Sequence, residues 1–167
     1  MNSKGDLTGL LFFIVSISAF AILLLIVGYI VPQINNQLRD KIGISPEINN
    51  SLNASTAVAK NTLPVLWLIL FSGLLMGLFA TSYLIPTHPI FAPIFVLLLV
   101  IAIVIAVPLS NAYEAIAENA ILSGAAAQQG LIVFIMANLP LMTFIIGLIS
   151  LVITFAKPGG GGVATYA

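Results

Sequence analysis

The chain has 167 residues, of which 60% are hydrophobic and only 6% are charged, and it contains no cysteine. A soluble domain needs about a quarter of its residues charged, so this composition indicates a protein that lies in lipid. The net charge of zero leaves no basic surface for nucleic acid. The absence of cysteine excludes disulfides, iron–sulfur clusters and thiolate zinc sites, and the single histidine excludes multi-histidine haem or copper sites.

Four long apolar runs predict four membrane-spanning helices, because about 20 apolar residues are needed to cross the hydrocarbon core. The first run covers residues 8–31 and is too long for the apolar part of a cleaved signal peptide. Pro32 follows it and, lacking an N–H group, predicts the end of that helix. The other three helices are expected at 63–84, 90–110 and 131–156. We therefore expect an all-α integral membrane bundle of four transmembrane helices, forming a single domain over residues 1–167.

Most of the charge lies in a polar connector, residues 33–61, between the first two spans. Ile34, Leu38 and Ile42 recur every four residues among polar neighbours, which predicts a short amphipathic helix. The run Ser45-Pro46-Glu47 is typical of a helix start and predicts a second short helix over 46–60. We favour an extramembrane connector packed on the bundle over the alternative, an arm that binds a partner or lies at the membrane interface.

The connection between the second and third spans, residues 85–89, is too short for a domain, so these spans must be antiparallel neighbours. The third helix is expected to continue beyond the membrane as a polar helical extension over 111–129, and a flexible glycine-rich tail covers 158–167. Four spans place both termini on one side. The Lys and Arg residues on the two sides are too evenly divided to decide the orientation.

Small residues at helical spacing predict where the helices pack, because lipid supplies no hydrophobic driving force and backbones must approach closely. The expected packing residues are Gly73, Gly77 and Ala80 in the second helix, Ala102, Ala106 and Ser110 in the third, and Thr143, Gly147 and Ser150 in the fourth. The GxxxG of the second helix is also typical of dimerisation between copies. Within a four-span chain we favour packing inside the bundle.

Asn138 and Pro140 lie inside the fourth apolar run and predict a kink. The proline leaves a backbone carbonyl without its donor, and Asn138 is placed to satisfy the break or to bond across to the third helix. Broken helices also line transporter sites. Without a second break and an intramembrane charge, we favour a structural kink.

No combination of residues predicts a catalytic, cofactor-binding or metal-binding site. Glu114 and Glu118 lie in a stretch too polar for the bilayer centre, and two carboxylates without further ligands make a poor calcium site. His88 is interpreted as a solvated turn residue. The polar extension is the place where we expect contact with a partner, through Asn111, Tyr113, Glu114 and Glu118.

Three short pieces carry a resemblance: Thr87-His88-Pro89-Ile90-Phe91, Asn111-Ala112-Tyr113-Glu114 and Asn138-Leu139-Pro140. In this order and spacing, residues 63–157 resemble small uncharacterised multi-pass membrane proteins encoded by phages and by archaeal or environmental viruses. The resemblance implies a virus-encoded membrane protein and assigns no functional residue.

The expected function is therefore that of a structural membrane protein, present in many copies in the membrane of a virion or phage. Its expected partners are the lipid bilayer and other membrane or capsid proteins, with no cofactor and no nucleic acid. A holin-like or channel-forming protein is one alternative, and an accessory subunit of a larger membrane complex is another. Outside the viral setting the expected location is the cell membrane.

Overall fold

The computed structural model describes residues 5–41, 45–84 and 92–156, and the regular structure in these ranges is helical. Three helical segments, at 9–40, 46–84 and 92–117, are long and apolar enough to cross a membrane. A bent pair of helices near the C-terminus would form the fourth span. The expected all-α membrane bundle is thus confirmed.

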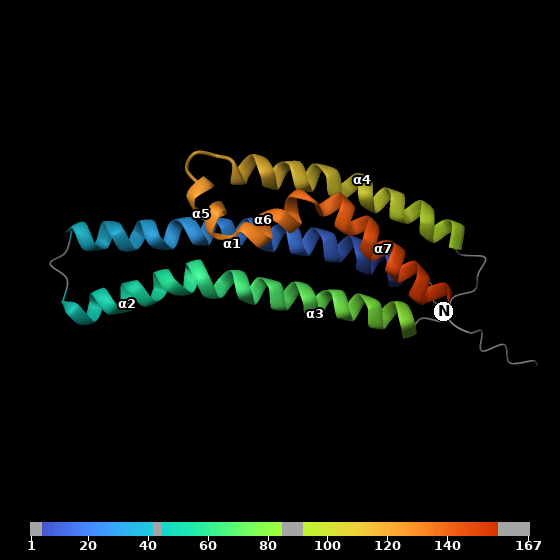
Figure 1. Ribbon diagram of the computed structural model, residues 1–167, viewed down its shortest axis with the longest axis horizontal. Helices are drawn as coiled ribbons and strands as arrows, with labels where there is room; N and C mark the ends of the chain where they lie inside the picture. Colours follow the sequence, from blue (N-terminus) through green and yellow to red (C-terminus); the bar gives the residue numbers. More distant parts are fainter. Residues whose placement is uncertain (1–4, 42–44, 85–91, 157–167) are drawn as a thin grey trace, which may run out of the picture.

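The described helices follow one another along the chain as α1 (Gly5–Lys41), α2 (Pro46–Ala57), the π-helical turn η1 (Val58–Thr62), α3 (Leu63–Leu84), α4 (Ala92–Ala117), α5 (Ser123–Gln128), α6 (Gly130–Ala137) and α7 (Leu139–Phe155). Figure 1 shows α1, α3, α4 and α7 side by side, with the start of α1, the end of α3, the start of α4 and the end of α7 at one end of the bundle. The described helix ends therefore agree with an even number of crossings.

The expected end of the first helix at Pro32 is wrong, because α1 continues through this proline to Lys41. Pro32 has no N–H to offer the carbonyl of Gly28, so one helical hydrogen bond is missing at this level. The helix continues because residues beyond the break are held by a neighbour. Asn35 is buried and bonds to α2, which fixes the direction of the chain after the proline.

Helix α3 has the predicted bounds, Leu63–Leu84, but it is not separate from the preceding helix, since α2, η1 and α3 form one continuous helical run. The Leu63 N–H bonds to the carbonyl of Val58, five residues back, which widens the helix by one residue at this turn. Pro64 lies next to this turn and cannot donate to the carbonyl of Lys60. The π turn is thus the way in which the chain accommodates Pro64 without ending the helix.

The predicted cap at Ser45 is confirmed, because its side chain accepts from the Ile48 N–H at 3.5 Å.

The polar extension of the third helix is shorter than predicted. Helix α4 ends at Ala117, a turn follows, and α5 starts at Ser123. Asn119 supports this turn, because its side-chain oxygen accepts from the Ile121 N–H at 3.0 Å. Asparagine competes with the helix for backbone hydrogen bonds in this way, which explains why the helical pattern stops here.

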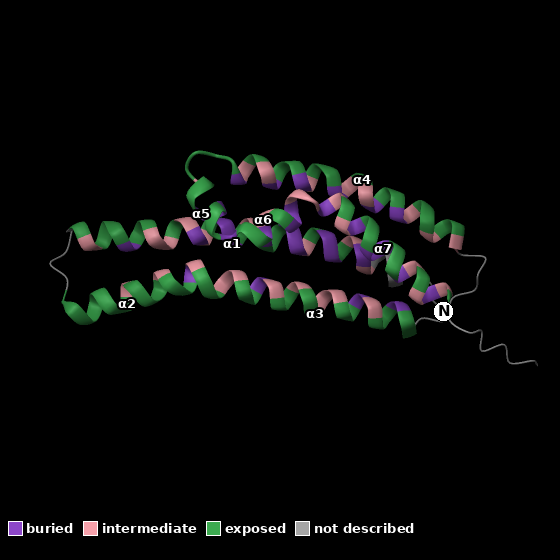
Figure 2. Ribbon diagram, viewed as in Figure 1, coloured by how far each residue is buried: buried purple, intermediate pink, exposed green. Residues whose placement is uncertain are grey.

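The core lies between α1, α4, α6 and α7, where Figure 2 shows most of the buried residues. On α1 the fully buried side chains include Ile14, Ile17, Ala21 and Leu25, at the three- and four-residue spacing of one helix face. Trp67 of α3 is also completely buried and stacks on Phe71 at 5.3 Å between ring centroids. Phe71 in turn lies 5.6 Å from Phe13 of α1 between ring centroids, so these aromatic side chains join α1 and α3.

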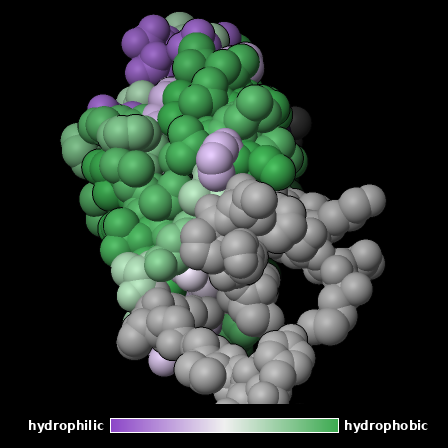
Figure 3. Space-filling view, turned by 90° about the vertical axis from the view of Figure 1, so that its right-hand side faces the viewer, coloured by the Kyte–Doolittle hydropathy of each residue, from purple (hydrophilic) through white to green (hydrophobic). Residues whose placement is uncertain are grey.

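The outer surface of the bundle is apolar. Large exposed side chains include Leu66 and Ile69 of α3 and Leu97 and Val104 of α4. Figure 3 looks at the end of the bundle where α3 and α7 end, and most of the residues coloured in this view are hydrophobic, with hydrophilic residues gathered at the upper edge. This is the surface expected of helices that face hydrocarbon.

Candidate functional site

The predicted packing residues of α4 and α7 are buried in the bundle. Ala102 and Ala106 have no exposed surface, and Ser110, Thr143 and Ser150 are each 2–3% exposed. Gly147 packs most tightly, because a Cβ built on it would lie 2.1 Å from Cδ1 of Leu99. These residues are buried, as their predicted packing role requires, and Gly147 leaves the space that the side chain of Leu99 occupies.

The packing prediction for α3 is wrong. Gly73, Gly77 and Ala80 all lie on its exposed face. A Cβ built on either glycine would meet nothing within 4 Å. The buried face of α3 carries Trp67, Leu78 and Ser82 instead. The large aromatic side chain takes the inner position, so the small residues are left on the surface.

The predicted kink is confirmed, because α6 and α7 meet at Asn138 with a bend of 73°. Asn138 Nδ2 donates to the carbonyl of Phe134 at 2.9 Å. The hydroxyl of Ser110 on α4 donates to the carbonyls of Met136 and Ala137, at 2.8 and 2.9 Å. Pro140 supplies no N–H to Met136, and the serine hydroxyl of the neighbouring helix takes that role. The break is therefore stabilised by two side-chain donors, Asn138 at the break itself and Ser110 of α4.

Gln129 was not identified from the sequence. It lies between α5 and α6 and is 3% exposed, and its Nε2 donates to the carbonyl of Leu24 in the middle of α1 at 3.1 Å. A Cβ built on Gly28 would lie 2.6 Å from this nitrogen. Gly28 thus leaves the space that the amide of Gln129 occupies. In the sequence, Gln129 is only an amide that follows an alanine run, and its hydrogen-bond partner Leu24 lies 105 residues away along the chain.

A polar helical hairpin extends beyond the apolar part of the bundle. It consists of residues 33–41 of α1 and residues 46–57 of α2, and α2 has no buried residue. Figure 1 shows these segments projecting past the end of α4. The ten residues from Pro32 to Lys41 correspond to about 15 Å of helix. The connector predicted from the sequence therefore forms this projection, and we refer to it as the polar hairpin.

Asn35 holds the two arms of the polar hairpin together. Its Nδ2 lies 3.0 Å from the carbonyl of Leu52 and 2.8 Å from each of the hydroxyl oxygens of Ser55 and Thr56. The two protons of the amide are shared among these three acceptors. Nearer the tip, the guanidinium of Arg39 donates to the side-chain oxygen of Asn53. Cross-helix hydrogen bonds of this kind give the polar hairpin a defined shape.

The four residues predicted to contact a partner do not share one environment. Asn111 and Glu118 are exposed, and Glu114 is half-buried. Tyr113 has no exposed surface and lies in the core, so its predicted role as a partner contact is wrong. It continues the inner face of α4 after Ala102, Ala106 and Ser110, and the helix period carries it inward.

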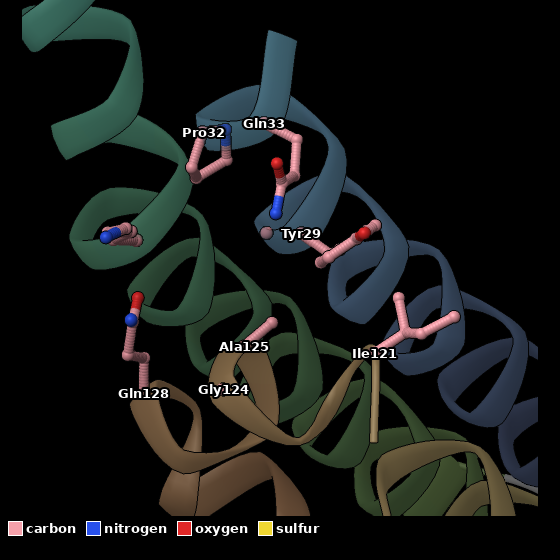
Figure 4. Close-up of a pocket in the computed structure, with 9 residues that line it drawn as sticks. Tyr29, Pro32, Gln33, Ile121, Gly124, Ala125 and Gln128 are labelled. Atoms are coloured by element: carbon pink, nitrogen blue, oxygen red, sulfur yellow. The ribbon is translucent and has the colours of Figure 1, made fainter. Parts of the chain in front are cut away.

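An open-sided pocket of about 210 Å³ lies where three helical irregularities meet. Its lining comes from α1 around Pro32, from the π turn η1 and from the region of α5. The lining residues are Gly28, Tyr29, Pro32, Gln33, Lys60, Ile121, Gly124, Ala125 and Gln128. Figure 4 shows Pro32 and Gln33 across the gap from Gly124 and Gln128. The amide ends of Gln33 and Gln128 both point into this gap.

The described residues contain no group of three or more His, Cys, Asp or Glu side chains that would hold a metal ion. His88 lies outside the described residues, as do the turn at 85–89 and the glycine-rich tail. No protein-family model, curated protein or solved structure matches this chain. The chain is a multi-pass helical membrane protein, and its function has to be argued from its own residues.

Proposed function

We propose that this protein is a structural membrane protein that anchors the polar hairpin to a bilayer and presents it to another protein. The observation that supports this proposal most directly is the hairpin itself, which is joined across its two arms by Asn35 and whose second arm, α2, has no buried residue. The apolar segments from which it extends supply the anchor. Such an arrangement requires no chemistry at a site.

The setting that we propose is a membrane-containing virion or phage, on the strength of the resemblance carried by residues 63–157. In that setting the partner of the polar hairpin is a capsid protein, and the protein is present in many copies. An accessory subunit of a cellular membrane complex would use the same hairpin with a different partner. The identity of the partner therefore separates these two settings.

Photo-crosslinking tests the proposal, and the absence of cysteine makes it simple to design. Asn50 is exposed on α2, and Met76 is 70% exposed on the apolar face of α3. Each position is replaced by cysteine in the full chain, labelled with a photoreactive group and activated in the native membrane or particle.

We expect a protein adduct of one defined mass from Asn50→Cys and lipid adducts from Met76→Cys. A capsid protein in the adduct supports the viral setting, and a subunit of a cellular complex supports the accessory-subunit alternative. Lipid adducts from both positions would refute the anchoring function. Purified particles of the source that lack the protein would refute the viral setting alone.

A further inference from the structure

The pocket at the base of the polar hairpin carries an uncompensated positive charge. Lys60 is half-buried in the π turn, and its side chain makes no hydrogen bond or ion pair with any residue that the structure describes. The nine lining residues include no aspartate or glutamate. A cation in such surroundings favours an anionic ligand.

The other lining side chains supply hydrogen-bond donors without charge. Gln33 and Gln128 carry amide N–H groups, Tyr29 carries a hydroxyl, and all three line the same pocket as Lys60. Pocket residues that donate hydrogen bonds around one cation suit a ligand with several acceptor oxygens, as in a phosphate group. Figure 4 shows both glutamine side chains directed into the space between the helices.

The position of the pocket along the bundle identifies the source of that phosphate. The apolar run of α1 ends at Val31, immediately before the lining residues Pro32 and Gln33, and the apolar run of α3 begins at Leu63, three residues after Lys60. The pocket therefore lies at the boundary between the apolar spans and the polar hairpin. Lipid headgroups lie at this level of a bilayer, and basic pockets between membrane helices bind anionic headgroups.

We propose that this pocket binds the phosphate of an anionic phospholipid headgroup, with Lys60 as the charged contact and Gln33 and Gln128 as hydrogen-bond donors. The acyl chains would run along exposed apolar side chains of the bundle, such as Leu131 of α6. The site requires nothing from a protein partner, so it is independent of the proposed anchoring function.

The test uses the full chain in dodecyl maltoside, titrated separately with dioleoyl phosphatidylglycerol, dioleoyl phosphatidylcholine and inorganic phosphate. Bound lipid is counted by native mass spectrometry, and the unfolding midpoint is followed through Trp67, which is the one tryptophan of the chain. We expect phosphatidylglycerol to bind and to raise the midpoint, and phosphatidylcholine and free phosphate to do so at least tenfold more weakly.

Two variants remove the charge from different places. Lys60→Gln is expected to weaken phosphatidylglycerol binding about five- to tenfold, the effect of one basic residue near an anionic membrane surface. Arg39→Gln removes the same charge from the polar hairpin outside the pocket lining and is expected to leave the affinity within twofold. Lys60→Arg retains the charge and should keep most of the binding.

A third variant fills the pocket without changing its charge. Gly124 lines the pocket and a Cβ built on it would meet nothing within 4 Å, so we expect the side chain of Gly124→Phe to occupy space in the pocket. We expect it to abolish lipid retention while the unfolding midpoint of the lipid-free protein stays unchanged. Equal binding by wild type, Lys60→Gln and Gly124→Phe would overturn the proposal, and so would equal binding of phosphatidylcholine or free phosphate.

Discussion

Gly147 is the position at which a single methyl group should perturb the bundle most clearly. In Gly147→Ala the new Cβ would lie 2.1 Å from Cδ1 of Leu99 and 3.1 Å from both its Cγ and its Cδ2. Leu99 is itself only 3% exposed, so its side chain has little space into which to move. The substitution must therefore push α7 away from α4 or force Leu99 out of its rotamer.

Two effects of opposite sign determine how much Gly147→Ala changes the free energy of unfolding. Alanine is favoured over glycine in a helix by about 1 kcal/mol. Inserting a methyl group into a packed core costs about 1–3 kcal/mol. Gly77→Ala is the matched control, because it carries the same propensity gain on α3 and its Cβ meets nothing within 4 Å. The propensity term cancels in the comparison, so Gly147→Ala should be less stable than Gly77→Ala by about 1–3 kcal/mol, or about 5- to 150-fold in the unfolding equilibrium constant.

Unfolding in mixed detergent micelles with increasing dodecyl sulfate measures this difference. Trp67 is completely buried and stacked on Phe71, so its fluorescence reports the loss of the contact between α1 and α3 without a label. The protein is kept at fewer than one chain per micelle, so that any association through the exposed GxxxG face does not contribute.

Leu99→Ala provides the internal check on the contact. Alone it should cost about 2–5 kcal/mol, the usual range for this substitution in a core. In its presence, Gly147→Ala should lose its penalty, because the atoms that it meets have been removed, and a double-mutant cycle should show a coupling energy of about 1–3 kcal/mol. Equal stability of Gly147→Ala and Gly77→Ala, or a coupling energy near zero, would refute the close contact between α7 and α4.

Three further substitutions test the buried polar contacts. Ser110→Ala removes the donor to two carbonyls at the α6–α7 break and should lower the free energy of unfolding in dodecyl sulfate by about 1–3 kcal/mol. Pro140→Ala in the same chain restores an N–H and should recover part of this loss. No recovery would contradict the inference that the Ser110 hydroxyl replaces the missing N–H of Pro140. Gly28→Ala should displace the amide of Gln129 and cost about 1–3 kcal/mol in the same assay, whereas Gly9→Ala, whose Cβ meets its nearest atom at 3.8 Å, should be neutral or slightly stabilising. Asn35→Ala should speed amide hydrogen exchange in α2 at least tenfold and leave exchange in α4 unchanged; unchanged exchange in α2 would show that the polar hairpin does not depend on this residue.

Hydrophobic patterning along the chain was sufficient to predict the membrane class, the four apolar runs and the kink at Pro140. Each of these depends on a local property, since a run of apolar residues needs lipid whatever its neighbours are, and proline lacks an N–H in every context. The inner faces of α4 and α7 were also predictable, because small residues at a spacing of three and four define a face that other helices can approach.

Local patterns were insufficient wherever a neighbour supplies the missing interaction. Pro32 predicts a helix end, yet the chain continues because Asn35 is bonded to an arm that lies 17 residues further on. The same GxxxG spacing that suits a helix interface lies on the outside of α3, because Trp67 and Leu78 occupy the inner face. Periodicity shows that small residues share one face of a helix, but it does not show whether that face points into the bundle or outward.

The sites of this protein depend most on the tertiary structure. Lys60, Gln33 and Gln128 come from three separate segments, and nothing in their local sequence connects them. They line one pocket because Pro32 of α1, the π turn η1 and the region of α5 lie at the same level of the bundle, next to the ends of the apolar runs of α1 and α3. Composition alone indicated a membrane protein, whereas the packing of its helices brings the cation of Lys60 and the amides of Gln33 and Gln128 to one pocket.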